Sequence, residues 1–251
     1  MKILLLSSVL AFLPIPYGQA PPPAASGLSV ANGWINASST SANNVAVTVA
    51  PTAGHLLVVG VASDTAVASS ISDNIGSTTG WTSIGNNHTT GGSYASMWYK
   101  KNIPSGMTTI TVTATGGGFV DACVMEVSGA STTTPFTSGE FATYTSGATS
   151  TANPQVGPVD NATANSIFFA LLTDADGSNP TTMNINGTGT VGTWNLKSIA
   201  AGYGGLSQEL NCSLYQPLSM TYIIVSSSAN HTHGWTTTSS PAAAVIADFH
   251  P

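Results

Sequence analysis

Short apolar or alternating runs follow one another along the chain, separated by clusters of Gly, Asn, Ser and Thr, and this pattern constrains the fold most strongly. Residues 45–49 alternate Val with Ala and Thr, whereas residues 55–62 (HLLVVGVA) form the continuous apolar run typical of a strand covered on both faces. Beyond the N-terminal segment, no long stretch has apolar positions at helical spacing. We therefore predict an all-β protein, an antiparallel β-sandwich of Greek-key or jelly-roll type.

The two halves of the chain echo each other. The apolar runs HLLVVGVASD and SIFFALLTD each precede a tryptophan, Trp81 and Trp194, and each half ends on an apolar run that holds an acid, VDACVMEV and AAAVIADF. The period is about 110 residues. Two small domains are one explanation, but each would bury only a thin core. We expect a single sandwich domain over residues 43–251 whose pseudo-duplicated halves share a core.

The first 20 residues predict the compartment. They contain one lysine, an apolar core from Ile3 to Leu13 and a small-x-Ala cleavage pattern that ends at Ala20, which is the order of a secretory signal peptide. The core is shorter than the roughly 20 residues of a membrane span, and no later run approaches that length. Residues 21–42 are expected to be a Pro- and Ser-rich extension. The mature protein should be secreted, extracellular and without a membrane span.

Charged side chains make up only 6% of the chain, against about 25% in an ordinary soluble domain. The basic residues are four lysines, so the chain has no arginine fork for phosphate and too few cations to neutralise a phosphate backbone. Nucleic acid is thereby excluded as an expected partner. Charge normally protects sheet edges against edge-to-edge pairing, so a neutral β surface favours association between copies of the chain.

Two covalent features fit an exported protein. Cys123 and Cys212 could form a disulfide that closes a loop of about 90 residues, stabilising by roughly 4–5 kcal/mol in the chain-entropy model. Two separate buried thiols are the alternative. Six N-x-S/T sequons are candidate glycosylation sites: Asn36, Asn87, Asn161, Asn186, Asn211 and Asn230.

A series of short motifs resembles a widespread bacterial secreted module. The motifs are GHLLVVGVASD, SISDNIGSTTGWTSIG, MWYKKNI, TITVTATG, MEVSGAS, TTPF and the terminal AAAVIADF. In that module the corresponding pieces are a GNLLVV-type strand, V-x-D-x-x-G-N-x-W/Y, WYAKNI, NTVTVT, EYSG, a P-F/L step and a closing apolar strand. The resemblance covers roughly residues 40–250. His55 replaces the usual Asn, and Val127 replaces the usual Tyr. The resemblance implies a β-sandwich in an exported or surface protein, and it implies no enzymatic activity.

The sequence offers no strong catalytic motif. The segment Gly76–Gly80 (GSTTG) has Thr where the nucleophile motif G-x-S-x-G needs Ser, and H-E-x-x-H and phosphate loops are absent. Asp121 and Glu126 would lie on opposite faces of one strand, so they cannot act as a glycosidase pair. We therefore expect no enzyme. His231 and His233 would share a face of an extended strand and could hold a metal ion, although surface histidines are the simpler interpretation.

Two kinds of ligand site remain as candidates. Asp174 and Asp176 have the spacing of a calcium loop, whereas a turn that uses Asp and Gly for its backbone angles is the alternative; calcium is the only candidate cofactor. An aromatic face for glycans is the second candidate, and it could be formed by Trp34, Trp98 and Trp235. Trp81 and Trp194 are left out of this face, because they recur in both halves and fit core roles.

These observations lead to two candidate functions. The first is a non-enzymatic extracellular structural or adhesive protein that partners with itself as a filament or matrix subunit. In this case residues 28–50 could add as a strand to a neighbouring copy, unless residues 43–50 form the first strand of their own domain. The alternative is a secreted carbohydrate-binding, lectin-like module that binds surface glycans.

Overall fold

The computed structural model describes residues 27–37, 43–64, 66–89, 92–116, 118–145, 154–160, 165–174, 184–185, 195–196, 218–225, 230–236 and 241–251. Within them the chain forms strands and no helix, and every paired strand is antiparallel to its neighbours, which confirms the predicted all-β class. The strands are β1 (Ser29–Ala37), β2 (Asn44–Thr48), β3 (Leu56–Ser63), β4 (Ala68–Asp73), β5 (Trp81–His88), β6 (Tyr94–Lys100), β7 (Thr109–Ala114), β8 (Val120–Ser128), β9 (Phe141–Thr145), β10 (Gln155–Asp160), β11 (Ser166–Asp174), β12 (Asn184–Ile185), β13 (Asn195–Leu196), β14 (Leu218–Val225), β15 (Asn230–Thr236) and β16 (Ala242–Phe249).

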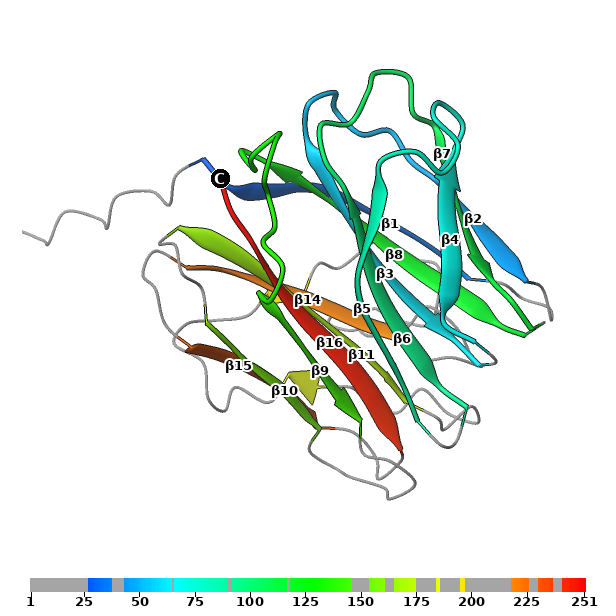
Figure 1. The fold of residues 1–251 in the computed structure, drawn as a ribbon, viewed down its shortest axis with the longest axis vertical. Coiled ribbons are helices and arrows are strands. Elements are labelled where there is room, and N and C mark those ends of the chain that lie inside the picture. The colour runs from blue at the N-terminus through cyan, green and yellow to red at the C-terminus, as the bar shows by residue number, and fades with distance from the viewer. Residues whose placement is uncertain are drawn as a thin grey trace, which may run out of the picture.

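The strands form four sheets (Figure 1). We call the five-stranded sheet β1-β8-β3-β6-β5 the first inner sheet and the three-stranded sheet β2-β7-β4 the first outer sheet. The second inner sheet is β13-β14-β11-β16-β9, and the second outer sheet is β10-β15-β12. Among the described residues, no helix could cross a membrane.

The two halves of the chain have the same topology. Adding eight to each strand number of the first inner sheet gives the order of the second inner sheet, and the same operation converts the first outer sheet into the second. The predicted pseudo-duplication is therefore confirmed. We call β1–β8 the first repeat and β9–β16 the second repeat.

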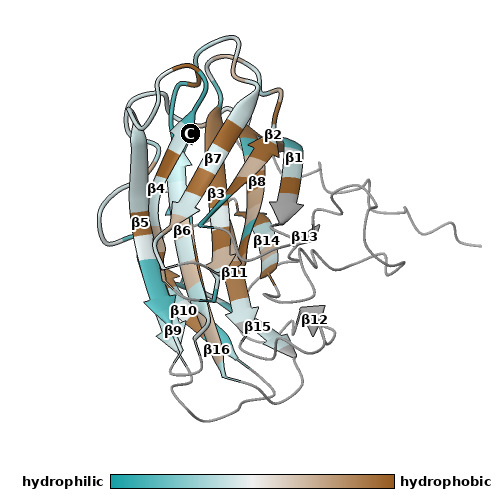
Figure 2. Cartoon of the chain, turned by 90° about the vertical axis from the view of Figure 1, so that its right-hand side faces the viewer, coloured by the Kyte–Doolittle hydropathy of each residue, from teal (hydrophilic) through white to brown (hydrophobic). Residues whose placement is uncertain are grey.

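Three hydrophobic clusters separate the four sheets, so the molecule has four layers rather than the two of a single sandwich. One cluster lies between the two inner sheets and is the shared core that the sequence predicts. The other two lie between the inner and outer sheet of each repeat, so each repeat also has a core of its own. Figure 2 shows this as apolar colour along the inner strands.

The central strands of the inner sheets are apolar because both of their faces are covered. In β3, Leu56 and Val58 face the shared core, whereas Leu57 and Val59 face the first outer sheet. All eight residues of β3 are buried. The continuous apolar run at residues 55–62 thus predicted a doubly covered strand correctly.

The predicted boundary of the folded domain at residue 43 is wrong. Residues 29–37 form β1, which pairs with β8 of the same chain along the edge of the first inner sheet. β2 pairs in turn with β7 in the first outer sheet. Much of the expected extension is thus part of the sandwich, and in this chain residues 28–50 supply two strands of its own sheets. The alternation in β1 is broken by a register shift between Val30 and Asn32, which explains why the sequence did not predict a strand there.

Gly60 and Leu171 determine how closely the inner sheets approach. A Cβ atom at Gly60 would lie 2.9 Å from Cδ1 of Leu171 and 3.0 Å from Sδ of Met220. Gly60 is in β3 and Leu171 is in β11, the equivalent strand of the other repeat. The side chain of one repeat therefore occupies the space that the glycine of the other leaves open.

We predict that Gly60→Val destabilises the chain by about 1–3 kcal/mol or more, because the added atoms overpack the shared core. Leu171→Ala should itself cost about 2–5 kcal/mol. In the double variant Gly60→Ala/Leu171→Ala, the truncated leucine should make room for the new methyl group, so the combined loss should be smaller than the sum of the two single losses. Urea unfolding of the three alanine variants gives this coupling energy. Gly76→Ala is the control, since the nearest atom to its new Cβ would be at an ordinary 3.5 Å. If the loss of stability in the double variant equals the sum of the two single losses, the proposed contact between Gly60 and Leu171 is contradicted.

Candidate functional site

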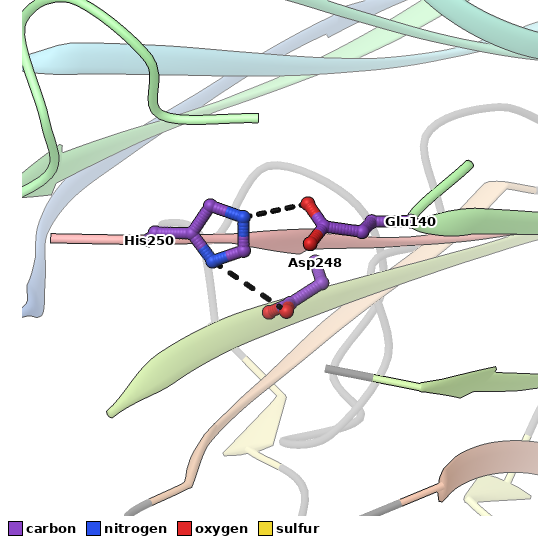
Figure 3. Close-up of side chains that lie close together, drawn as sticks. All are labelled: Glu140, Asp248 and His250. Atoms are coloured by element: carbon purple, nitrogen blue, oxygen red, sulfur yellow. Dashed lines mark hydrogen bonds and ion pairs between the residues drawn. The ribbon is translucent and has the colours of Figure 1, made fainter. Parts of the chain in front are cut away.

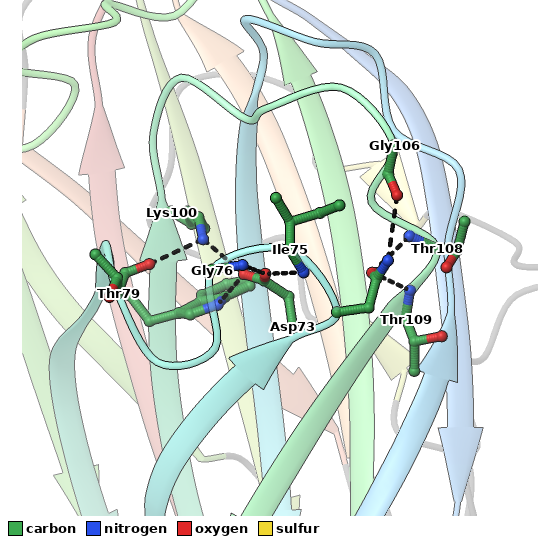
Figure 4. A network of polar contacts seen from close by, with 10 residues as sticks. Asp73, Ile75, Gly76, Thr79, Lys100, Gly106, Thr108 and Thr109 are labelled. Carbon is green, nitrogen blue, oxygen red and sulfur yellow. Dashed lines mark hydrogen bonds and ion pairs between the residues drawn. The ribbon is translucent and has the colours of Figure 1, made fainter.

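Asp73 is the centre of a buried polar network at the end of β4 (Figure 4). Its Oδ1 accepts hydrogen bonds from the backbone amides of Ile75 and Gly76, at 2.9 and 2.7 Å. Its Oδ2 accepts from Trp81 Nε1 at 2.9 Å and from Lys100 Nζ at 2.6 Å. The Asp73 side chain has no exposed surface, so every acceptor position is used inside the protein. This network holds the loop between β4 and β5 in place.

Glu126 in β8 is the centre of a second satisfied network. Its Oε2 accepts from Asn32 Nδ2 at 2.6 Å, and its Oε1 accepts from the Thr52 amide at 2.8 Å and lies 2.6 Å from His55 Nδ1. Burial alone would raise the pKa of Glu126, but the hydrogen bonds from Asn32, Thr52 and His55 outweigh it and lower that pKa. Glu126 therefore stays ionised and ties β1, β8 and the segment before β3 together.

The second repeat carries a different cluster at the position equivalent to Glu126. Glu126 lies opposite Leu57 of β3 in the register, and Asp248 of β16 lies opposite Phe168 of β11 in the same way. On the other side, Asn32 of β1 lies opposite Glu126, and Asp248 donates its backbone N–H to the Glu140 carbonyl at 3.0 Å. Where the first repeat pairs a carboxylate with an amide, the second repeat thus places two carboxylates side by side.

His250 lies between these two carboxylates (Figure 3). Its Nε2 is 2.6 Å from Glu140 Oε2, and its Nδ1 is 3.7 Å from Asp248 Oδ2. The Ser166 hydroxyl, at the start of β11, is 3.5 Å from the same Nδ1. The Asp248 side chain is fully buried, and neither of its oxygens has a hydrogen-bond partner. Among the described residues, this is the group of His and acidic side chains whose spacing would suit a metal ion.

The electrostatics of the cluster differ from those of Glu126. Burial and the nearby Glu140 carboxylate raise the pKa of Asp248 to about 8. Ser166 and the backbone amide of Phe249 lower the pKa of Asp248, but their effect is smaller. Neither group reaches hydrogen-bond geometry with the Asp248 carboxylate. Asp248 therefore keeps its proton to a higher pH than an ordinary aspartate does.

The segment between the two repeats positions this cluster. Pro135 accepts a hydrogen bond from the His250 amide at 2.9 Å, and Ser131 donates one to the His250 carbonyl at 3.0 Å. Phe136 packs its ring 5.8 Å from the ring of Phe249, measured between centroids. The Glu140 carboxylate accepts from the Thr137 amide at 2.9 Å. The TTPF motif thus fastens the end of β16 to the segment that leads into β9.

The geometry does not favour a hydrolase at this cluster. Ser166, His250 and Glu140 form a chain of polar contacts that has the residue types of a nucleophile, base and orienting acid. Ser166 is fully buried, however, so its hydroxyl cannot meet a substrate in this conformation.

The structure removes one residue from the predicted glycan face. Trp235 is fully buried in β15 and donates its Nε1–H to the Ser219 hydroxyl at 3.1 Å. It belongs to the core of the second repeat, not to a polar loop. Trp34 and Trp98, like Trp81, are partly buried against the core of the first repeat. An exposed three-tryptophan platform is therefore wrong, because the alternation of β15 points residue 235 inward.

The two histidines considered as a metal pair are buried core residues. The His231 ring packs at a tilt against Phe168, with ring centroids 4.3 Å apart, and His233 Nε2 lies 3.2 Å from the Thr221 hydroxyl. Burial lowers the pKa of His231, and it lowers the pKa of His233 to about 3. Both rings are therefore neutral at physiological pH, and the interpretation as surface histidines is wrong.

Several predicted sites lie partly or wholly outside the described residues. Cys123 is a free, fully buried thiol whose pKa burial raises, and Cys212 lies outside, so the disulfide has no support and stays a prediction. The calcium pair is not tested, since Asp176 and the Asp174 side chain lie outside. Among the sequons, Asn230 is exposed and Asn87 is half-buried; Asn161, Asn186, Asn211 and the Asn36 side chain lie outside.

No family model, no curated protein and no solved structure matches the chain. The resemblance to the bacterial secreted module thus stays a prediction that rests on the motifs alone.

Sequence reasoning missed the Glu140–Asp248–His250 cluster. Glu140 is about 110 residues from the other two, and no fixed spacing links them. The available signal was the echo between the halves: the closing runs VDACVMEV and AAAVIADF each hold an acid near their end, and the partners of one acid indicate where to look for those of the other.

We predict that Asp73→Asn destabilises the chain by about 3–5 kcal/mol, because it leaves the buried Lys100 ammonium without its anion. Urea unfolding at neutral pH measures this loss. Asp160→Asn is the control, since Asp160 is exposed and its loss should change stability by no more than about 0.5 kcal/mol. Equal effects of the two substitutions would contradict a special role for Asp73.

Acid should destabilise the protein through the same two networks. For Asp73, as for Glu126, burial alone would raise the pKa, but hydrogen bonds lower it below its ordinary value, which is 3.8 for Asp73 and 4.5 for Glu126. A group with a lowered pKa in the folded state stabilises that state above its unfolded pKa, and this stabilisation is lost as pH falls through the folded value. Unfolding free energies measured from pH 7 to pH 2 should therefore fall below about pH 4.5, and less so in Asp73→Asn; an unchanged slope in the variant would contradict this.

Proposed function

We propose that the chain is an exported, non-enzymatic structural or adhesive protein that associates with copies of itself through its sheet edges. The observation that carries the proposal is the composition of two edge strands. β1 is an edge of the first inner sheet and β2 an edge of the first outer sheet, and neither contains a charged residue. Edge strands of monomeric proteins usually carry charge, proline or irregularity that blocks pairing with another chain.

β2 offers the more regular of these two edges. Its five residues pair with β7 without a register shift, whereas β1 has a shift between Val30 and Asn32. The side chains of β2 alternate between exposed and buried, with Asn44, Ala46 and Thr48 outward. Asn44 and Thr48 could contact a second copy at this edge without bringing like charges together.

The buried positions of several charged residues strengthen this argument. Four acidic side chains are fully buried: those of Asp73, Asp121, Glu126 and Asp248. Lys100 is only 6% exposed. The surface is therefore even less charged than the 6% composition indicates. Few charged side chains are therefore left on the surface to block contact between copies at a sheet edge.

We predict that Thr48→Lys weakens self-association about tenfold or more, because it introduces a charge on the β2 edge that a second copy would have to approach. Thr109→Lys is the matched control: Thr109 lies directly opposite Thr48 in the register, on β7, which is the central strand of its sheet. Sedimentation velocity over a range of concentrations measures the association, and electron microscopy shows whether filaments form.

Three outcomes would count against the proposal. These are a wild-type chain that stays monomeric at high concentration, equal association of the two lysine variants, and specific glycan binding by a monomer on a glycan array. The last outcome would favour the carbohydrate-binding alternative, for which Trp34 and Trp98 remain partly exposed.

A further inference from the structure

The position of Asp248 raises a specific electrostatic problem. Its equivalent in the first repeat, Glu126, is compensated by three hydrogen-bond donors from Asn32, Thr52 and His55. Asp248 is as deeply buried, but neither of its oxygens has a hydrogen-bond partner, and a second carboxylate, Glu140, lies nearby. A buried carboxylate without donors is costly unless a cation accompanies it.

The distances separate two kinds of contact around His250. Two ligands of one tetrahedral ion, each about 2.1 Å from it, are ~3.4 Å apart. The separations of His250 Nδ1 from Asp248 Oδ2 and from the Ser166 hydroxyl are 3.7 and 3.5 Å, close to this value. The 2.6 Å between His250 Nε2 and Glu140 is too short for two ligands of one ion and suits a hydrogen bond.

Glu140 therefore has the place of an orienting group. Histidines that bind metal ions commonly donate their other ring N–H to a carboxylate, which fixes the ring and makes the ligating nitrogen more basic. With the Nε2 proton donated to Glu140, the Nδ1 lone pair points toward Asp248. A lone pair that faces a carboxylate is favourable only when a cation lies between them.

We propose that this cluster is a divalent metal site in which His250 Nδ1, the Asp248 carboxylate and the Ser166 hydroxyl bind the ion and Glu140 orients the imidazole. The mixed nitrogen and oxygen donors suit a transition ion such as Zn²⁺ better than Ca²⁺, which prefers six to eight oxygen ligands. The His250 side chain is 10% exposed, so water can supply the remaining ligand. This site differs from the calcium pair that the sequence predicts at Asp174 and Asp176.

The role of the ion follows from what the cluster connects. Asp248 and His250 lie at the end of β16, Ser166 begins β11, and Glu140 precedes β9. These are three neighbouring strands of the second inner sheet. An ion bound here would link the C-terminal residues to the segment between the two repeats and so stabilise the folded state.

The test uses the full chain, freed of metal by chelation and then titrated with Zn²⁺, Co²⁺ or Ca²⁺. We expect equilibrium dialysis to show one Zn²⁺ bound per chain at this site. Zn²⁺ should raise the midpoint of thermal unfolding, and Ca²⁺ should cause no rise that depends on this site. Asp248→Asn should bind one ion fewer and lose the Zn²⁺-dependent rise. Without metal, it should be at least as stable as the wild type, because it removes a buried carboxyl group that lacks hydrogen-bond donors.

Two further variants distinguish the roles within the cluster. Glu140→Gln should keep the ion but bind it about 10- to 100-fold more weakly, since it alters only the orienting contact. His55→Gln changes the imidazole of the Glu126 network in the other repeat and should leave Zn²⁺ binding unchanged. Equal Zn²⁺ binding by wild type and Asp248→Asn, or no Zn²⁺ binding by either, would overturn the proposal and leave a proton as the cation between His250 and Asp248.

Discussion

The packing of the two inner sheets against each other is the constraint on which the rest of the structure depends. Each inner sheet has an outer sheet on its second face, so the central strands β3 and β11 have no solvent-exposed face. These strands must therefore be apolar throughout, and one small residue, Gly60, must leave room for Leu171 of the opposite sheet. The buried charged side chains of the inner sheets lie near strand ends, where backbone donors or other side chains can reach them.

The positions of the buried acids follow from this constraint. Glu126 and Asp248 both lie near the end of the closing strand of their repeat, on the face away from the shared core. In the first repeat Asn32, Thr52 and His55 supply enough donors to hold a permanent charge. In the second repeat, as far as the described residues go, the Asp248 carboxylate has no such donors, and His250 lies between it and Glu140. The same fold thus supports a satisfied structural network in the first repeat and, in the second, the acidic cluster for which we propose a metal ion.

Much of the architecture could be predicted from the sequence, because it depends on local patterns. The apolar run at 55–62 and its echo at residues 166–172 predicted doubly covered strands, and the order of runs in each half predicted the duplication. The four layers could not be predicted, since an apolar face does not show which sheet covers it. β1 was missed because its register shift breaks the alternation, and Trp235 was misplaced because Asn, His and Thr around it resemble a loop.

The polar networks depend on contacts across the sheet: Asp73 meets Trp81 and Lys100 only after the β5–β6 register brings those two side by side.

The low charge of the chain has a different meaning once the charges are located. A composition with 6% charged residues describes a weakly charged surface, but several of those residues are buried, and Lys100 and Asp73 neutralise each other inside the protein. The mutual packing of the inner sheets covers their broad apolar faces, so these faces are not available for association between copies. What remains outside is a set of Thr-, Ser- and Asn-rich outer faces and sheet edges. Of these, the sheet edges are the places where backbone groups of a second copy could form ordered contacts without any charged side chain. Edge pairing is accordingly the mode of self-association that we propose for a protein of this architecture.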